Sequence, residues 1–577
     1  MRSLVVANCS GFYGDRLSAL REVVEGGPVD VVTGDYLAEL TMLILFRSRA
    51  KNPLRGYATT FLRQLEDVLG TVVERGTRVV VNAGGLAPAA CADAVRELAA
   101  RLGVPLAVAH VEGDDLLSRV PDLAATHLAH LDTGEPLGER APLTANAYLG
   151  AWGIAAALQG GAQVVVTGRV TDASLVVGPA AAHFGWAKDA WDELAGAVVV
   201  GHILECGTQA TGGNYSFVTE EVARPVHPGF PLAEIDADGS ATITKHPGTA
   251  GAVTVGTVTA QLLYEIAGPC YAGPDVMAHF DTVELAQEGP DRVRVSGVRG
   301  SPPSGRLKVA LNMVGGFRNR MEFVLTGLDI EQKAQLALDG LDDALIVRPA
   351  TVEHRLVRLD RPDAPTNEQA AALLRVTVKD PEPGPVGRAF SSAAVELALA
   401  SYPGFTLTTS PGDATPYGVY WPALVPAELV PHVVAHADGR REEIAHTPAG
   451  PLGPSRPVHL PALRVEAVRR APLGLLVGAR SGDKGGNANV GVWARTAEAA
   501  EWLLGWLTEQ RFRELLPEAD GLPVHVYPLP NLRAVNVVVV GLLGEGVAAS
   551  TRFDPQAKGL GEYLRSRDVE IPTRLLR

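Results

Sequence analysis

The chain has 577 residues, of which 46% are hydrophobic and 20% are charged, and its formal net charge is −14 at pH 7. This length predicts two to four domains, and the composition is that of a globular protein. The negative charge argues against a nucleic-acid partner, because binding to a phosphate backbone needs a basic face. A local Arg or Lys site could still hold a small anionic substrate.

The apolar run at residues 4–7 is too short for the core of a signal peptide, and no later stretch of membrane-spanning length lacks a charged or polar break. The four cysteines lie far apart and form no CxxC pair. Their spacing argues against a disulfide framework or a structural zinc site. These features predict a cytoplasmic protein without a membrane partner.

Short β-branched runs alternate with helix-like stretches through the first 180 residues. The runs occupy residues 4–7, 29–32, 78–81, 106–109 and 164–166. Continuous apolar runs are typical of buried parallel strands, and alternation with helices predicts βαβ units. We therefore predict an α/β fold whose N-terminal domain, residues 1–240, is a parallel sheet with helices on both faces.

The pattern changes after this domain. Residues 241–445 mix β-rich segments with helices, which predicts an α+β middle region. Residues 446–471 are rich in Pro and Gly and are interpreted as a linker. Residues 472–577 have a β–α–β–β–α pattern, which suits a small ferredoxin-like domain.

Polar residues and glycines follow the predicted strands at residues 8–11, 35–36, 82–85, 112–115 and 167–172. Ligands of open α/β sheets bind outside the carboxyl ends of the strands, so these segments are expected to converge on one crevice. For any single segment a turn or a helix cap is the simpler interpretation. Caps alone do not require the charged set Glu112, Asp115, Arg169 and Asp172.

Long motifs in a fixed order resemble the acyclic terpene utilisation (AtuA) family. They lie at residues 8–15, 35–42, 82–85, 112–115, 144–150, 168–172, 201–207, 211–213 and 245–249. Residues 479–489 resemble the signature of the ferredoxin-fold domain that ends many members. The one departure is Thr171, where Ala is expected. The resemblance spans nearly the whole chain.

The resemblance implies a metabolic context. Members of the family occur beside enzymes that degrade citronellol and geraniol as coenzyme A thioesters. It therefore implies an acyl-CoA or carboxylate substrate, with CoA as part of that substrate. The strand-end positions of these motifs nominate the following substrate-binding residues: Asn8, Ser10, Gly11, Asn82, Gly84, Gly85 and Asn146.

Two carboxylate pairs are candidates for acid–base chemistry. Asp35 and Glu39 stand four residues apart at the start of a predicted helix and could divide acid and base roles. The alternative is a capping aspartate with a first-turn glutamate. Glu112 and Asp115 could supply a general base or bind Mg²⁺, or could simply cap the next helix. No His/Cys set or repeated Asp spacing supports a metal, so none is predicted.

Two further groups mix cations, carboxylates and a thiol. Arg169 could hold a carboxylate or phosphate with its bidentate fork, or could pair with Asp172 within the loop. His202 shares a helical face with Glu205 and Cys206, which could form an acid–base or thiolate group. A buried cysteine beside a satisfied histidine is the alternative.

The glycine-rich segment 480–487 could form an anion nest from consecutive backbone N–H groups. It contains neither a Walker A ending nor a GxGxxG fingerprint. A domain or subunit contact is the alternative. The binding residues predicted here are Arg480, Ser481, Lys484 and Asn487.

These observations predict an acyl-CoA-processing lyase or hydratase that acts on branched or terpenoid acids. Arg169, with the Gly84–Gly85 backbone, is expected to hold the carboxyl or thioester oxygen, and Glu112 or Asp115 to move the proton next to the carbonyl. No redox cofactor is called for, and a homo-oligomer is expected. Two alternatives are a non-catalytic scaffold subunit of an acyl-CoA carboxylase or pathway enzyme and, weakened by the missing phosphate loops, a nucleotide-dependent enzyme.

Overall fold

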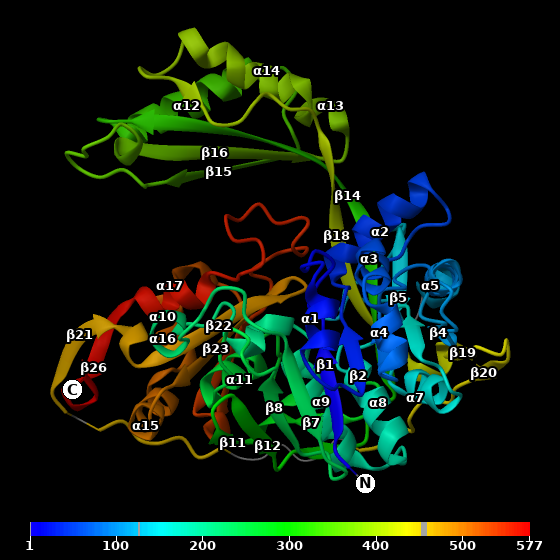
Figure 1. The fold of residues 1–577 in the computed structure, drawn as a ribbon. Coiled ribbons are helices and arrows are strands. Elements are labelled where there is room, and N and C mark those ends of the chain that lie inside the picture. The colour runs from blue at the N-terminus through cyan, green and yellow to red at the C-terminus, as the bar shows by residue number, and fades with distance from the viewer. Residues whose placement is uncertain (1, 125–126, 452–457, 465, 577) are drawn as a thin grey trace. The chain divides into compact units, whose positions relative to one another are not determined.

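The computed structural model describes residues 2–124, 127–451, 458–464 and 466–576. These residues form two compact units, residues 1–312 with 420–577 and residues 313–419. Both units combine strands and helices (Figure 1). No helix within the described ranges has both the length and the apolar character needed to cross a membrane.

The first unit is built on a large mixed sheet. In spatial order its described strands are β11 (Glu284–Gly289), β12 (Arg292–Ser296), β8 (Ala241–Lys245), β7 (Pro231–Ile235), β1 (Leu4–Asn8), β2 (Val31–Gly34), β3 (Arg78–Val81), β6 (Val164–Thr167), β4 (Val108–Glu112), β19 (Val433–Ala435) and β20 (Arg441–Glu443). The stretch from β1 to β4 is parallel. The carboxyl ends of these strands therefore lie at one edge.

Helices cover both faces of the parallel stretch. Val79 and Val81 share one core with helices of the first face, whereas Val80 between them points to the other face and is also fully buried. The helices of the first core are α1 (Ala19–Gly26), α3 (Thr59–Glu66), α4 (Leu69–Glu74) and α5 (Pro88–Leu102). Outside that core, the strands contact α7 (Trp152–Gln159), α8 (Ser174–Phe184) and α9 (Trp191–Leu204). The α/β fold predicted for the N-terminal region is confirmed.

The middle of the chain adds strands such as β8, β11 and β12 to this sheet before it enters the second unit. The predicted boundary at residue 240 falls in the turn between β7 and β8, which pair as antiparallel neighbours. Of the predicted linker, residues 452–457 and 465 lie outside the described residues. Its described part contains no helix or strand before β21 (Val468–Pro472).

The second unit is a two-layer α+β structure. Its described strands include β15 (Thr351–Val357), β16 (Ala371–Asp380), β17 (Thr406–Leu407) and most of β14 (Arg306–Thr326). Alternate residues of β14, such as Met321 and Phe323, pack on α12 (Ile330–Ala344) and α14 (Arg388–Glu396). The first residues of β14 belong to the other unit, where residues 309–312 pair with β5 (Thr144–Ala147).

The C-terminal part of the first unit is a ferredoxin-like domain, as predicted. Its antiparallel sheet has the order β22-β23-β25-β24. These strands are β22 (Val477–Lys484), β23 (Asn487–Ala494), β25 (Ala534–Val539) and β24 (Val524–Leu529). One core joins the sheet to α15 (Ala497–Trp506) and α17 (Leu560–Ser566).

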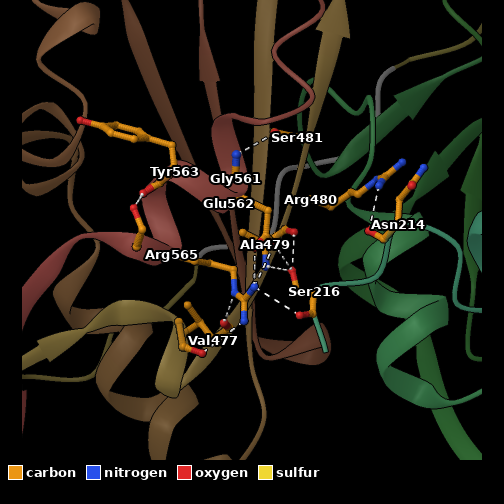
Figure 2. Close-up of polar contacts among 12 residues, drawn as sticks. Asn214, Ser216, Val477, Ala479, Arg480, Ser481, Gly561, Glu562, Tyr563 and Arg565 are labelled. Atoms are coloured by element: carbon orange, nitrogen blue, oxygen red, sulfur yellow. Dashed lines mark hydrogen bonds and ion pairs between the residues drawn. The ribbon is translucent and has the colours of Figure 1, made fainter. Parts of the chain in front are cut away.

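Polar contacts attach this domain to the segment that follows α9. Figure 2 shows Ser216, whose hydroxyl donates to Ala479 O at 2.9 Å and accepts from Ala479 N at 3.1 Å. Arg480 donates to Asn214 O at 3.1 Å, and Arg565 donates to Ser216 O at 3.3 Å (Figure 2). These bonds fix the position of β22 relative to the large sheet.

A buried amide pair makes a second attachment. Asn489 Oδ1 accepts from Glu265 N at 2.7 Å, and its Nδ2 donates to Asn536 Oδ1. Asn536 in turn donates to the carbonyl oxygens of Ile266 and Ala267. Asn489 and Asn536 are both fully buried, so their hydrogen bonds have no water to replace them.

We predict that Asn489→Ala lowers the free energy of unfolding by about 1–3 kcal/mol, because it removes the hydrogen-bond partner of Glu265 N and that of Asn536 Oδ1. Urea unfolding followed by circular dichroism measures this loss. Asn52→Ala is the control, since its side chain accepts one exposed bond from Leu54 N, and its effect should stay within about 0.5 kcal/mol. Equal effects of the two substitutions would contradict the role of the amide pair.

Candidate active site

The ends of β2 and β3 are tied together by a buried carboxylate and a buried amide. Asp35 Oδ1 accepts from Leu37 N at 3.0 Å and from Asn82 Nδ2 at 2.6 Å. Asn82 Oδ1 accepts from Tyr36 N at 2.7 Å. Burial and the charge of Asp172 raise the pKa of Asp35, although Arg169 opposes the rise. Asn82 thus positions Asp35 and is not free to bind a ligand with these atoms.

Asp114 is the residue of the 112–115 motif that reaches the site. It is buried, and its Oδ2 accepts from Arg169 N at 2.9 Å and from Asn146 Nδ2 at 2.8 Å. Burial raises the pKa of Asp114 to about 7. Glu112 and Asp115 were predicted from the sequence as the candidate bases instead of Asp114, because the motif alone does not tell which carboxylate points inward.

Arg169 is buried at the end of β6 and contacts three strand ends. Its Nη1 donates to Asp172 Oδ1 at 2.7 Å, and its guanidinium lies 4.2 Å from the ring centroid of Tyr148. Burial alone would lower the pKa of Arg169, but Asp172, Tyr148 and the carboxylates Asp35 and Glu39 raise it well above its usual value. The guanidinium therefore stays charged and holds these groups together.

Lys308, from the first residues of β14, is the second cation of the site and is half-buried. Its ammonium lies 4.8 Å from the ring centroid of Tyr148 and 5.5 Å from that of Tyr420. It pairs with Glu39 Oε1 at 3.5 Å, where α2 (Glu39–Lys51) begins. Desolvation would raise the pKa of Glu39, but Lys308 and Arg169 lower it to about 2. Glu39 is therefore ionised at neutral pH.

The end of α9 contributes a buried histidine and glutamate. His202 Nδ1 lies 3.0 Å from Glu205 Oε1. Burial and the charge of Lys484 lower the pKa of His202 to about 4, so the imidazole is neutral at pH 7. Burial, Asp172 and Glu265 raise the pKa of Glu205. Cys206 also has a raised pKa through burial, which keeps its thiol protonated and argues against the thiolate alternative.

The turn between β22 and β23 brings two more charged residues from the ferredoxin-like domain. Lys484 Nζ lies 5.8 Å from the ring centroid of Tyr271. Burial, with Glu265 and Glu39, raises the pKa of Asp483 to about 8. Lys484 was predicted from the sequence, but Asp483 was not. Asp483 could have been found as the carboxylate next to a predicted binding lysine in a glycine-rich segment.

We call this group of interacting side chains the strand-end cluster. Its members are Asp35, Glu39, Tyr148, Arg169, Asp172, His202, Glu205, Glu265, Tyr271, Lys308, Tyr420, Asp483 and Lys484. It unites six of the eight residues predicted for catalysis with Lys484, which was predicted for binding. Lys308, Tyr148, Tyr420, Tyr271, Glu265 and Asp483 were not predicted.

A small cavity of about 40 Å³ opens beside the cluster. Glu39, Asp483, Tyr420 and Asn312 provide its polar wall. Its apolar lining comes from Leu40, Leu43, Val547 and Ala548. The lining thus combines charged and apolar side chains. A larger groove of about 570 Å³, lined by residues such as Arg224, His227 and Thr249, contains no member of the cluster.

Glu112 and Asp115 lie outside the strand-end cluster. Glu112 pairs with Arg441 of β20 and lies 4.0 Å from His110 Nε2. Asp115 is exposed, and its Oδ1 accepts from Leu117 N at 3.0 Å, which is the capping geometry named as the alternative. Among the described residues, no group of three or more His, Cys, Asp and Glu side chains is arranged to hold a metal ion.

The remaining predicted residues of the first strand end position the backbone. Asn8 Nδ2 donates to Leu204 O at 2.6 Å and to Glu205 O at 3.1 Å, so it fixes the end of α9. Ser10 Oγ donates to Phe12 O at 3.0 Å. A Cβ on Gly11 would lie 2.8 Å from the carbonyl carbon of Cys206, so the glycine allows close approach to the same helix end.

Gly84 and Gly85 also serve close packing. A Cβ on Gly84 would lie 2.4 Å from Thr167 O. Gly85 has a φ of +50°, and a Cβ there would lie 2.9 Å from Gly56 O. These contacts explain both glycines without a ligand.

Three residues of the predicted anion nest are engaged within the protein. Arg480 donates to Asn214 O, as Figure 2 shows, and its guanidinium lies 4.6 Å from the ring centroid of Tyr264. Ser481 Oγ accepts from Gly561 N at 2.8 Å. Asn487 Oδ1 accepts from Gly541 N at 2.9 Å. Their contacts are those of the domain junction that was named as the alternative.

The fold and the site define a multidomain α/β protein whose ferredoxin-like domain completes a buried polar cluster at the strand ends. Residues 4–436 match the family model described as Acyclic terpene utilisation family protein AtuA, and residues 471–570 match the AtuA ferredoxin-like domain. The chain therefore belongs to the acyclic terpene utilisation family, which confirms the resemblance found in the motifs. No curated protein and no solved structure matches the chain.

We predict that Asp114 makes the protein less stable as the pH rises from about 4 to about 7. In this window the unfolded chain has lost the Asp114 proton, whereas the folded chain, with its pKa raised to about 7, retains it. The folded state binds more protons, so the free energy of unfolding falls with increasing pH. Each pKa unit corresponds to about 1.4 kcal/mol. Over this pH range the free energy of unfolding of wild type should therefore fall by on the order of 2–4 kcal/mol more than that of Asp114→Asn.

Urea unfolding of both proteins at pH 4.5, 6 and 7.5 measures the difference. Asp115→Asn is the matched control, because its carboxylate belongs to the same motif but is exposed. Parallel pH dependences of wild type and Asp114→Asn would show that Asp114 titrates alike in the folded and unfolded chains.

Proposed function

We propose that the protein is an enzyme, an acyl-CoA-processing lyase or hydratase for branched or terpenoid acids, and that it transfers a proton next to the thioester carbonyl. The observation that carries this proposal is the raised pKa of Asp483, about 8, beside the cavity. A general base is most effective when its pKa lies near the working pH. Asp483 meets this condition. Glu39, which also lines the cavity, does not, because its pKa is about 2.

The charge balance of the strand-end cluster supports proton transfer. Its cations are Arg169, Lys308 and Lys484, and its carboxyl groups outnumber them. Raised pKa values at Asp35, Glu205 and Glu265 mean that protons remain on some of these groups. A site that holds both ionised and protonated carboxyl groups can accept a proton at one position and return it at another.

The proposed step begins with Asp483 as its carboxylate. It takes the proton from the carbon next to the carbonyl, and the C–H electron pair forms the enolate of the thioester. In the dehydration direction, the hydroxyl group on the next carbon takes a proton from a protonated carboxyl group of the cluster and leaves as water. Arg169 acts as a positioning residue here, because its contacts orient Asp172 and Tyr148.

The apolar side of the cavity favours an aliphatic acyl group. Leu40 and Leu43 of α2 face Val547 and Ala548 across the cavity lining. Burying each CH₂ of a substrate there contributes about 0.8 kcal/mol. Membership of the acyclic terpene utilisation family fits branched chains of this kind.

We predict that the protein catalyses exchange of the α-proton of a branched acyl-CoA with solvent deuterium, and that Asp483→Asn slows this exchange about 10²–10⁴-fold. The wild-type rate should rise with pH until about 8 and then level off, because the base must be ionised. Mass spectrometry of the recovered thioesters measures the exchange and also reports gain of water or loss of acetate.

Asp520→Asn, an exposed aspartate of the same domain, is the matched control and should keep the wild-type rate. If none of a panel of saturated, unsaturated and 3-hydroxy acyl-CoAs changes mass, the result would favour the alternative, a non-catalytic partner of a carboxylase or pathway enzyme. Exchange that survives Asp483→Asn would retain the enzyme but move the base elsewhere.

A further inference from the structure

Two buried phenol groups of the strand-end cluster have no hydrogen-bond acceptor among the described residues. The O–H groups of Tyr148 and Tyr420 lack an acceptor although the residues are only 7% and 8% exposed, and Lys308 can approach the Tyr420 oxygen only as a donor. An O–H group that is buried without an acceptor costs about 1–3 kcal/mol. Such groups in a native protein call for an explanation, and a bound ligand is one.

The two tyrosines come from distant parts of the chain and meet at one place. Tyr148 directly follows β5, and Tyr420 lies on β18 (Thr415–Pro426). Both pack against Ala310 in a single cluster. Lys308, two residues earlier on β14, places its ammonium near both rings. Two tyrosine side chains and one cation thus lie next to one another.

Tyr420 connects this group to the cavity where proton transfer is proposed, whereas Tyr148 and Lys308 lie behind it. Tyr420 lines the cavity together with Glu39 and Asp483. Burial raises the pKa of Tyr420 well above its usual value, and Lys308 only partly offsets the rise. The phenol is therefore a proton donor at neutral pH. Lys308 can donate to a phenol oxygen, but it cannot accept the phenol proton.

We propose that Tyr148, Tyr420 and Lys308 form the binding site for an anionic substrate oxygen, namely the enolate oxygen of the thioester. This inference rests on the proposed function and deepens it. When Asp483 takes the α-proton, the new C=C bond displaces the carbonyl π pair onto oxygen, so most of the negative charge appears on that atom. Preorganised donors that point at a developing oxyanion are the usual source of its stabilisation.

The site replaces the oxygen-binding role that the sequence argument gave to Arg169 and the Gly84–Gly85 backbone. Arg169 is already paired with Asp172 and lies over the face of Tyr148. Its charge near that ring makes the phenol a better donor. Arg169 is thus a positioning residue, and the two phenols make the contact with oxygen.

The first test uses the protein without ligand. Removing an unpaired buried O–H should not cost stability, so Tyr148→Phe and Tyr420→Phe should keep or raise the melting temperature. Tyr215→Phe is the matched control, because the Tyr215 hydroxyl donates to Glu221 Oε2 at 2.7 Å, and this variant should melt at a lower temperature. If all three variants lose stability alike, the phenols have partners within the protein and the proposal fails.

The second test measures binding of two stable CoA probes by calorimetry. One carries a carboxylate in place of the thioester carbonyl, as an oxyanion mimic, and the other is an alkyl thioether with no oxygen. Each Tyr→Phe variant should bind the carboxylate probe about tenfold more weakly and the thioether equally well. Equal losses for both probes, or no binding of the carboxylate probe to wild type, would overturn the oxyanion site.

The outcomes separate the two proposals. If the carboxylate probe binds in a tyrosine-dependent way but no acyl-CoA exchanges its α-proton, the oxygen site stands and the proposed reaction falls. If exchange occurs and both phenylalanine variants exchange at the wild-type rate, the reaction stands and the oxygen site is wrong.

Discussion

The structure depends on an imbalance of buried charge at the carboxyl ends of the parallel strands. The strand-end cluster contains the carboxyl groups of Asp35, Glu39, Asp172, Glu205, Glu265 and Asp483 and three cations, and Lys558 is a further cation near Glu265 and Asp483. Desolvation penalises each extra negative charge, so the pKa values of several carboxyl groups rise while that of Glu39, next to Lys308, falls. Ionised and protonated carboxyl groups therefore lie close together in one cluster.

The fold creates the imbalance because it brings distant segments to one edge of the sheet. β2 and β6, which lie on either side of β3, deliver Asp35 and Arg169 at the same edge, and Glu205 follows α9. Lys308 arrives on β14, which is joined to the site through β5. Unsatisfied buried charges are costly, and each segment therefore has to dock correctly before the cluster becomes stable. The site and the packing of the first unit are energetically coupled.

Local rules account for what the sequence predicted well. β-branched runs and the polar residues after them identified the strand ends, and so Asp35, Arg169 and Asp172 were predicted together. Asp114 was missed in favour of Asp115, because adjacent residues of a turn can point inward or outward and periodicity does not decide between them. Tyr420 could not be found either, since it reaches the site through strand pairing, and no local motif marks that contact.

The ferredoxin-like domain is part of this electrostatic unit. Its turn carries Asp483 into a region already occupied by Glu39 and Glu265, and their charges, after burial, set its pKa near 8. Asn489 of the ferredoxin-like domain accepts a hydrogen bond from the backbone N–H of Glu265, which lies outside that domain. Displacing the domain would therefore hydrate Asp483 and remove its negative neighbours, and both changes lower its pKa. Docking of the domain and the raised pKa of Asp483 are consequently coupled.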